Sequence, residues 1–339
     1  MIIIQNLFLY LCSDIIIKES SGIMKKRRIK KSVIRKCLVL FVTFILIIIL
    51  SVVVKTAKYH KTDEYKLKII GYSKDEIEII KTQGNDIVDY ILNNSYNDKF
   101  DDIINEKYYI ESNFERYVNY LQYSSDLTEV IAVVNVNRDK EEYTDTKKTE
   151  TEKKELMLTN KYNYLDKDYK PDDIITISSR YAYSGNEAPK EIFEYYKEMF
   201  DAAEADGVEL IISSAYRDYK NQEETYEYYK QTKGEDFAKT YAALPGYSEH
   251  QTGLAFDILT TGTLTDDFEK TDEFEWLIKN SYKYGFILRY PKDKEKITGY
   301  DYESWHFRYV GKQAAKRIHD ENITFDEYYA YYVEFNGAN

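Results

Sequence analysis

Residues 248–257 read SEHQTGLAFD, and residues 303–307, further along the chain, read ESWHF. These two stretches contain two of the four histidines in the 339-residue chain. A zinc hydrolase needs three protein ligands, neutral imidazole or carboxylate, and leaves a fourth position for the water that the metal activates. His250, Asp257 and His306 meet that requirement. We therefore predict that these three side chains hold one Zn²⁺ ion.

The spacing of the three residues also predicts local structure. Asp257 lies in an alternating stretch that is typical of a strand, and a glycine-containing turn lets His250 approach the same point. His306 is expected to come from an adjacent strand. The spacing is equally compatible with a hydrogen-bonded structural histidine and with Asp257 as a turn cap, so these interpretations stay open on spacing alone.

Two further residues supply the remaining chemistry. Glu303 lies three residues before His306, which suits a general base that takes a proton from the water and returns it to the leaving amine. Arg217 closely follows a predicted strand that ends at Ser214. Its guanidinium group can stabilise a developing oxyanion or a substrate carboxylate.

The composition argues against one class of binding partner and limits which residue types can bind a metal. A formal net charge of −12 argues against a nucleic-acid partner, which requires a concentrated basic face. Both cysteines, Cys12 and Cys37, precede residue 40, so the later part of the chain has no thiolate ligand and no internal disulfide. Any metal there must be held by histidine and carboxylate.

From Leu156 onward, predicted strands alternate with helices, which indicates an α+β domain over residues 156–320. We predict helices over Pro189–Ala205, Tyr219 to about Lys230, and Asp272–Tyr284. We predict strands over Val208–Ser214, Leu254–Ile258 and Trp305–Val310. The Tyr-rich tail within residues 321–339 is expected to dock on this domain as an amphipathic helix.

Upstream of this domain, hydrophobic spacing predicts a small, mainly helical spacer module over residues 55–137. Within it, the β-branched run VIAVVNV at residues 130–136 predicts a strand. Residues 138–155 are nearly all charged or Thr, which is typical of a solvated linker.

The stretch CLVLFVTFILIIILSVVV, residues 37–54, carries no charge and has about the minimum length that spans a bilayer. Eight Lys or Arg residues lie between Lys25 and Lys36. The positive-inside rule therefore predicts that residues 1–36 lie in the cytoplasm and that the chain after the span is exported. A cleaved signal peptide is the alternative, although no clear small-x-small cleavage site follows. Met24 followed by KKRRIKK resembles a natural start, which suggests that residues 1–23 are an extension upstream of the true start.

The motifs resemble those of the VanY-type D-alanyl-D-alanine carboxypeptidases, whose zinc fold is shared with lysostaphin-type peptidases and the hedgehog domain. The resemblance covers about Leu156–Gly311, in the order LTNKYNYLDKDYKPDD, SSAYRDYKNQ, PGYSEHQTGLAFD, YGFILRYP, ITGY and ESWHFRYVG. It implies an α+β fold with a small antiparallel sheet flanked by helices, and one Zn²⁺.

Carried over by position, the resemblance also implies a role for each site residue. The implied zinc ligands are His250, Asp257 and His306. The implied catalytic residues are Glu303 as the base and Arg217 as the group that polarises the carbonyl. The implied substrate-pocket residues are Ser214, Gln222 and Ser248. Ser304 stands where family members are expected to have proline, a change that alters local stiffness more than chemistry.

The function implied is that of a membrane-anchored zinc D,D-carboxypeptidase outside the cell, which removes the C-terminal D-Ala of peptidoglycan stem peptides. An L,D-carboxypeptidase or a peptidoglycan endopeptidase is an alternative, because the same motifs serve all three. A non-catalytic wall-binding or sensor module that keeps the fold is an alternative from another class. The sequence leaves the oligomeric state open.

Overall fold

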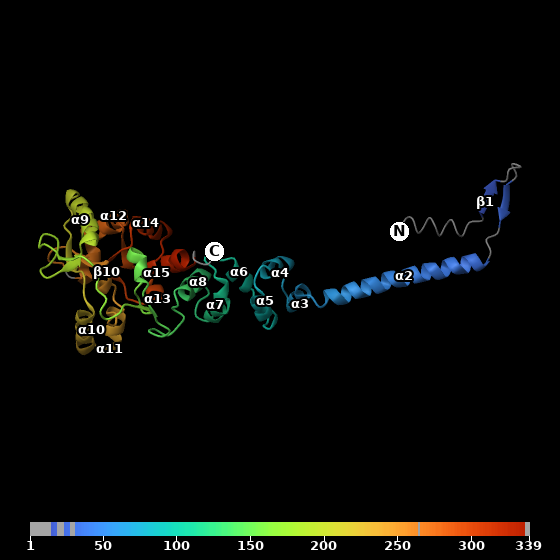
Figure 1. The fold of residues 1–339 in the computed structure, drawn as a ribbon, viewed down its shortest axis with the longest axis horizontal. Helices are drawn as coiled ribbons and strands as arrows, with labels where there is room; N and C mark the ends of the chain where they lie inside the picture. The colour runs from blue at the N-terminus through green and yellow to red at the C-terminus, as the bar shows by residue number, and fades with distance from the viewer. Residues whose placement is uncertain (1–14, 19–23, 28–30, 264, 336–339) are drawn as a thin grey trace. The chain divides into compact units, whose positions relative to one another are not determined.

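The computed structural model describes residues 15–18, 24–27, 31–263 and 265–335. Cys12 and most of the predicted extension over residues 1–23 therefore lie outside the described residues. The chain forms two compact units, residues 1–97 and 98–339, and each is described by itself (Figure 1).

The first unit contains a short antiparallel pair and a long apolar helix. Strands β1 (Ile15–Lys18) and β2 (Met24–Arg27) pair antiparallel. Helix α2 (Lys31–Tyr59) includes the predicted span, and none of its residues is buried against protein. By length and composition it is the one helix of the described chain that could cross a membrane. The unit then continues with α3 (Asp63–Ile70), α4 (Lys74–Ile80) and α5 (Asn85–Leu92).

The second unit opens with α6 (Phe100–Ile104), α7 (Phe114–Tyr120) and α8 (Leu127–Asn135). The boundary between the units thus falls inside residues 55–137, which we predicted as one module. The predicted strand at residues 130–136 is wrong, because these residues lie mostly in α8. Asp126 caps this helix by accepting from the backbone N–H of Thr128, and Val130–Asn135 are all buried. Burial on every face explains the continuous apolar run, which β propensity alone misassigned.

The charged segment over residues 138–155 is partly packed. Its strand β3 (Lys147–Lys148) pairs in parallel with β4 (Asn163–Tyr164). Thr149 is only 3% exposed and donates a hydrogen bond to the carbonyl of Leu158. The prediction of a solvated segment therefore fails at Thr149, whereas both residues of β3 are exposed and the predicted domain boundaries stay a prediction.

A four-stranded antiparallel sheet in the order β7-β8-β10-β9 forms the centre of the second unit and confirms the predicted α+β class. Its strands are β7 (Ile211–Ser214), β8 (Ala255–Leu259), β9 (Phe286–Tyr290) and β10 (Glu303–Tyr309). A smaller antiparallel pair consists of β5 (Ile174–Thr176) and β6 (Glu187–Pro189). Three of the central strands overlap those predicted from the sequence.

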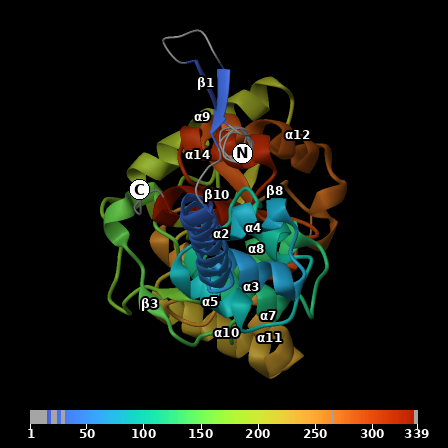
Figure 2. The same cartoon turned by 90° about the vertical axis from the view of Figure 1, so that its right-hand side faces the viewer.

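Helices lie on two sides of the second unit. One side holds α9 (Lys190–Ala205), α12 (Asp272–Asn280) and α14 (Lys312–Glu321). The opposite side, in both Figure 1 and Figure 2, holds α10 (Tyr219–Lys233) and α11 (Glu235–Tyr241). The remaining helices are α13 (Glu295–Thr298) and α15 (Phe325–Tyr328). After α15 the tail forms a π-helical turn over Tyr329–Glu334, in which Tyr329 and Tyr331 are buried.

The main hydrophobic core packs one face of the sheet against α9. Phe256 and Phe307 contribute from β8 and β10, and Tyr196 and Met199 contribute from α9. Because successive side chains of a strand point to opposite faces, the residues next to these two phenylalanines face away from the core. Those neighbours include Asp257 and His306, so the core side of the sheet determines where the polar site can form.

Candidate metal centre and active site

The pairing of β8 with β10 places Asp257 directly opposite His306. His250 comes from a short 3₁₀ turn, Glu249–Thr252, which is capped by Ser248. The turn ends at Gly253 with φ of +72°, where an added Cβ would lie 2.6 Å from Pro189 Cγ, so a glycine is required. Strand register and turn together bring the three predicted ligands to one point.

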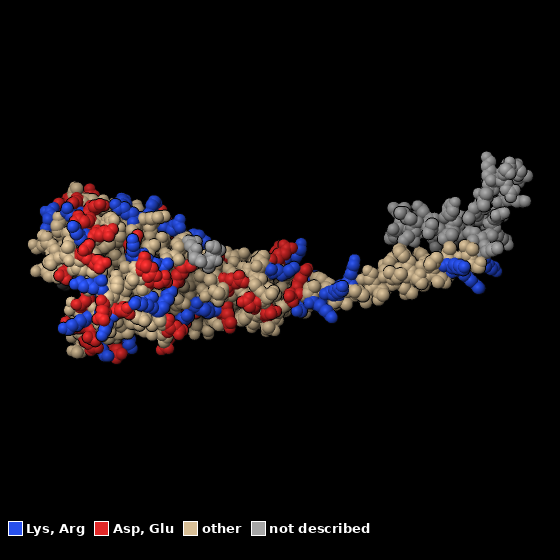
Figure 3. All heavy atoms as spheres, in the orientation of Figure 1, with Lys and Arg blue, Asp and Glu red and all other residues tan. Residues whose placement is uncertain are grey.

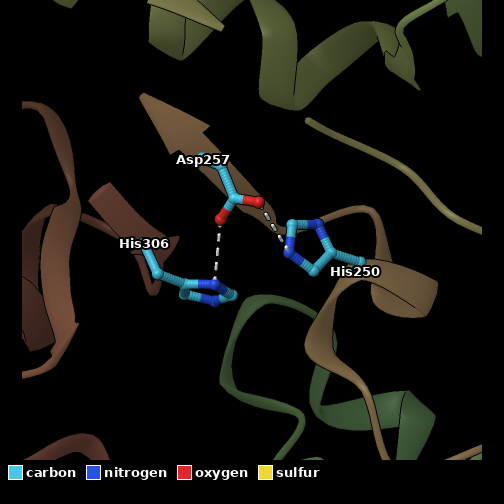
Figure 4. Close-up of side chains that lie close together, drawn as sticks. All are labelled: His250, Asp257 and His306. Carbon is cyan, nitrogen blue, oxygen red and sulfur yellow. Dashed lines mark ion pairs between the residues drawn. The ribbon is translucent and has the colours of Figure 1, made fainter. Parts of the chain in front are cut away.

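The three side chains converge as Figure 4 shows, and one ligand atom from each lies within 4.8 Å of the others. Asp257 Oδ2 lies 3.4 Å from His250 Nε2, and Asp257 Oδ1 lies 3.1 Å from His306 Nδ1. The structure thus brings together the metal ligands predicted from the sequence.

The orientation of His250 is set by the protein backbone. Its Nδ1 lies 2.7 Å from the carbonyl oxygen of Ala215, which can only accept, so Nδ1 carries the proton. Nε2 is then the free nitrogen that faces Asp257. Histidine ligands of metals are commonly oriented by a hydrogen bond of this kind from their other nitrogen.

The chemistry of the three ligands fits a divalent cation such as Zn²⁺. Asp257 Oδ1 is buried and has no hydrogen-bond partner among the described residues, as expected of an atom reserved for an ion. Burial lowers the pKa of His250, which favours the neutral imidazole that a metal requires. Burial alone would raise the pKa of Asp257, but the two imidazoles lower it overall, so the carboxylate stays ionised.

Glu303 is the first residue of β10 and lies beside the ligands. Its Oε2 is 3.4 Å from His306 Nδ1, and its side chain is nearly buried. Burial raises the pKa of Glu303 to about 8, and the nearby charge of Asp257 contributes to the increase. A carboxyl group with a raised pKa can accept and return a proton near neutral pH, which suits a general base. Ser304, which replaces the expected proline, is buried within the same strand.

Arg217 lies between β7 and α10 in the chain and contacts the turn that carries His250. Its backbone N–H donates to the carbonyl of His250, and its Nη1 lies 3.4 Å from Thr225 Oγ1. Its Nε is buried without a hydrogen-bond partner in the described chain, and burial lowers the pKa of the guanidinium group. Arg217 therefore has donors available for a bound anion.

A cavity of about 160 Å³ connects these groups. The predicted residues that line it are His250, Asp257, His306, Glu303, Arg217, Gln222 and Ser248. Gln222 donates Nε2 to the carbonyl of Ala243, and its Oε1 is buried with no partner among the residues described. Ser214 is not among the lining residues. It pairs with Asp257 across β7 and β8, so it supports the strand that carries this ligand.

Sequence reasoning missed an aromatic wall of this cavity. The wall consists of Tyr229, Tyr241, Tyr290, Tyr300 and Trp305. Trp305 precedes a predicted ligand in the sequence, where an aromatic residue commonly packs in the core, and the tyrosines cannot be told apart from the other Tyr residues among the 36 in the chain. It also missed Glu249, a buried carboxylate next to His250 that faces His306.

The fold and this site define the class of the protein as a carboxypeptidase-like α+β domain, and comparisons with known proteins give the family. The family model for VanY, D-alanyl-D-alanine carboxypeptidase, matches residues 186–312. YodJ of Bacillus subtilis is 44% identical over 181 residues, which cover 51% of this chain and 66% of YodJ. This chain therefore spans just under two thirds of the length of that relative.

Two further comparisons cover most of the matched protein. The bifunctional D-Ala-D-Ala dipeptidase and D-Ala-D-Ala carboxypeptidase VanXYC of Enterococcus gallinarum is 34% identical over 188 residues, covering 53% of this chain and 95% of VanXYC. A solved structure of the LdcB LD-carboxypeptidase is 40% identical, with a TM-score of 0.52, and the match covers 56% of this chain and 91% of that chain. The chain belongs to the VanY family of D-alanyl-D-alanine carboxypeptidases.

We predict that the full-length chain in detergent binds one zinc ion and that Asp257→Asn weakens the affinity more than about 100-fold, because a neutral amide oxygen replaces the anionic ligand. A competition titration with a chromogenic chelator measures this affinity. Asp166→Asn, which removes an exposed carboxylate paired with Lys148, is the matched control and should bind zinc normally. Equal affinity of the Asp257 variant and the unmodified chain would contradict the assignment.

Proposed function

We propose that this chain is a zinc-dependent D,D-carboxypeptidase that removes the C-terminal D-Ala from peptidoglycan stem peptides. One observation carries the proposal: His250, Asp257 and His306 converge in one cavity with Glu303 and Arg217. This arrangement contains a metal-binding group, a base and a cation, which are the parts that metal-assisted peptide hydrolysis requires. Membership of the VanY family supports the choice of substrate.

The ligands would hold Zn²⁺, which lowers the pKa of a bound water toward about 7 and polarises a carbonyl. Glu303 would take the proton of the attacking water on its carboxylate and pass it to the nitrogen of the leaving D-Ala. Arg217 would hold the developing oxyanion or the terminal carboxylate with its free donors.

Gln222 and Ser248 are proposed to contact the substrate, because both line the cavity. The buried Oε1 of Gln222 can accept a substrate N–H, and its Nε2 is held by the carbonyl of Ala243. The Ser214 hydroxyl is not proposed to touch substrate, since Ser214 does not line the cavity.

An L,D-carboxypeptidase is the second candidate function. The specific observation in its favour is the similarity to LdcB, at 40% identity and a TM-score of 0.52. The catalytic groups would be the same for both activities, so only the walls of the cavity, including Tyr229 and Tyr241, can separate them.

Glu303→Gln should leave zinc bound while lowering turnover by roughly 10²- to 10⁴-fold, because the amide keeps the shape of the side chain but cannot accept a proton. Release of free D-Ala and zinc content are measured on the same preparation. Unimpaired turnover in this variant would remove Glu303 from the mechanism.

Two further variants, a second test and a control, complete this experiment. Arg217→Ala should also keep zinc and lose about 10²- to 10³-fold in turnover, as expected for an oxyanion contact. Ser214→Ala, on β7 beside Asp257 but outside the cavity lining, should change neither zinc content nor turnover by more than a few fold.

Defined stem peptides should distinguish the two carboxypeptidase activities. We expect a pentapeptide ending in D-Ala-D-Ala to release D-Ala faster than a tetrapeptide ending in a single D-Ala. Mass spectrometry of the products measures both rates, and a pentapeptide ending in L-Ala is the matched control. Cleavage of the tetrapeptide alone would establish the L,D activity in place of the D,D activity.

We further propose that α2 anchors the chain with residues 1–36 in the cytoplasm and the second unit outside. Figure 3 shows α2 as a stretch without charged side chains, with basic side chains at either end. Eight Lys or Arg lie between Lys25 and Lys36, against three Lys between Lys55 and Lys61, and the positive-inside rule favours the first flank in the cytoplasm.

External protease should therefore digest the second unit in cells stripped of their wall, while the chain stays in the membrane fraction. An immunoblot against the second unit follows its loss, and a cytoplasmic marker protein serves as the control for cell integrity. Protection of this unit would reverse the proposed topology. A full second unit in the medium would identify α2 as a cleaved signal.

A further inference from the structure

A cluster of four charged side chains lies next to His306, where it is almost completely buried. Its members come from four elements, and each is at most 3% exposed: Glu249 before β8, Arg289 on β9, Arg308 on β10 and Asp326 on α15. Two carboxylates and two guanidinium groups balance each other, so the cluster has no net charge. The proposed reaction uses none of these four residues.

The cluster is connected through specific atoms. Glu249 Oε1 accepts from Arg289 Nε at 2.8 Å and lies 2.9 Å from Arg308 Nη1. Arg289 Nη1 donates to Asp326 Oδ2 at 2.6 Å, and Asn160 Nδ2 donates to Asp326 Oδ1 at 2.8 Å. Both arginines therefore act on the same oxygen of Glu249 and leave its other oxygen free.

That other oxygen faces the metal ligand. Glu249 Oε2 lies 3.6 Å from His306 Nε2. In the described part of the chain, neither of these two buried atoms has a hydrogen-bond partner. His306 Nδ1 lies on the side of the ring that faces Asp257 (Figure 4). If the side chains of Glu249 and His306 moved slightly closer together, each of these two atoms would gain a hydrogen-bond partner. Buried polar atoms are rarely left without one.

We propose that Glu249 is a positioning residue, which accepts the Nε2–H of His306 and thereby presents the Nδ1 lone pair to the metal. Arg289 holds Glu249 in place, and Asp326 holds Arg289. Buried ion pairs therefore connect the C-terminal segment to the metal site. This inference rests on the proposed metal site. It assigns His306 the opposite tautomer to His250, whose Nδ1–H is held by Ala215.

Stability alone does not account for such a cluster. Buried ion pairs are weak contributors to stability, because the desolvation of the charges offsets most of their attraction. A carboxylate that orients a histidine ligand has a specific consequence, since such partners fix the tautomer and raise the basicity of the ligand. The orientation of Oε2 toward His306 is what the positioning role requires.

The variant Glu249→Gln tests whether Glu249 fixes the tautomer of His306. The two guanidinium groups present only donors to Oε1, so the amide oxygen of a glutamine must stay there. The NH₂ group of the glutamine then faces the Nε2–H of His306, so two hydrogen-bond donors face each other. Nε2–H loses its acceptor, and the tautomer that exposes Nδ1 to the metal is no longer favoured.

The test uses the full-length chain in detergent, loaded with zinc and labelled with ¹⁵N on histidine, which gives signals from only four side chains. His60→Gln and His319→Gln identify the two signals outside the site. In the unmodified chain, we expect a metal-bound Nδ1 and a low-field Nε2–H proton for His306. In Glu249→Gln, that proton should move upfield while the Nδ1–H of His250 stays in place, and the zinc dissociation constant should rise about 10- to 100-fold.

Two further variants keep the proposal falsifiable if Glu249→Gln fails to fold. Asp326→Asn should move the Nε2–H proton of His306 in the same direction by a smaller amount. Asp139→Asn disrupts a partly buried ion pair with Arg116, whose Nε lies 2.9 Å from Asp139 Oδ2, and should leave zinc affinity and both proton signals unchanged. A His306 protonated on Nδ1, or Asp326→Asn and Glu249→Gln chains that bind zinc normally with unshifted signals, would overturn the proposal. An unmodified chain that binds no zinc would instead refute the metal site itself.

Discussion

The antiparallel pairing of β8 with β10 is the constraint on which the site depends. It sets Asp257 opposite His306 through backbone hydrogen bonds, with Phe256 opposite Phe307 on the neighbouring positions. Because side chains alternate along a strand, burial of the phenylalanines in the core commits the two ligands to the other face. A slip of one residue would instead pair Asp257 with Phe307 or His306 with Phe256, so the hydrophobic core and the candidate metal site favour the same register.

Much of the second unit could be predicted from its sequence, because its elements end at residues with a physical reason to end them. Gly285, with φ of +91°, follows the helical segment that begins at Asp272, as predicted, although its last turn is 3₁₀. The failures concern long-range packing. Residues 130–136 carry a strand-like composition, but their helix is buried on every side. Composition cannot reveal how many faces of a segment the rest of the chain will cover.

The convergence of His250 and His306 could be predicted because histidine is rare in this chain, which has four. The role of Glu249 could not be predicted, because it depends on Arg289 and Arg308, which are distant in sequence and indistinct from other arginines. Ser214 is the converse case. Its position in a motif suggested contact with the substrate, whereas in the structure Ser214 pairs with Asp257 and does not line the cavity.

Three buried carboxylates lie within this site, and their surroundings separate their roles. Asp257 lies between two imidazoles and Glu249 contacts two guanidinium groups, and in both cases these partners outweigh the effect of burial and lower the pKa of the carboxyl. Within the described residues, no Lys or Arg forms an ion pair with Glu303, and burial raises its pKa to about 8. Groups whose surroundings push their pKa values apart can divide acid–base work from ligation. The same fold thus lowers the pKa of two carboxyl groups and raises that of the third, which is what the proposed division between metal binding, orientation and proton transfer requires.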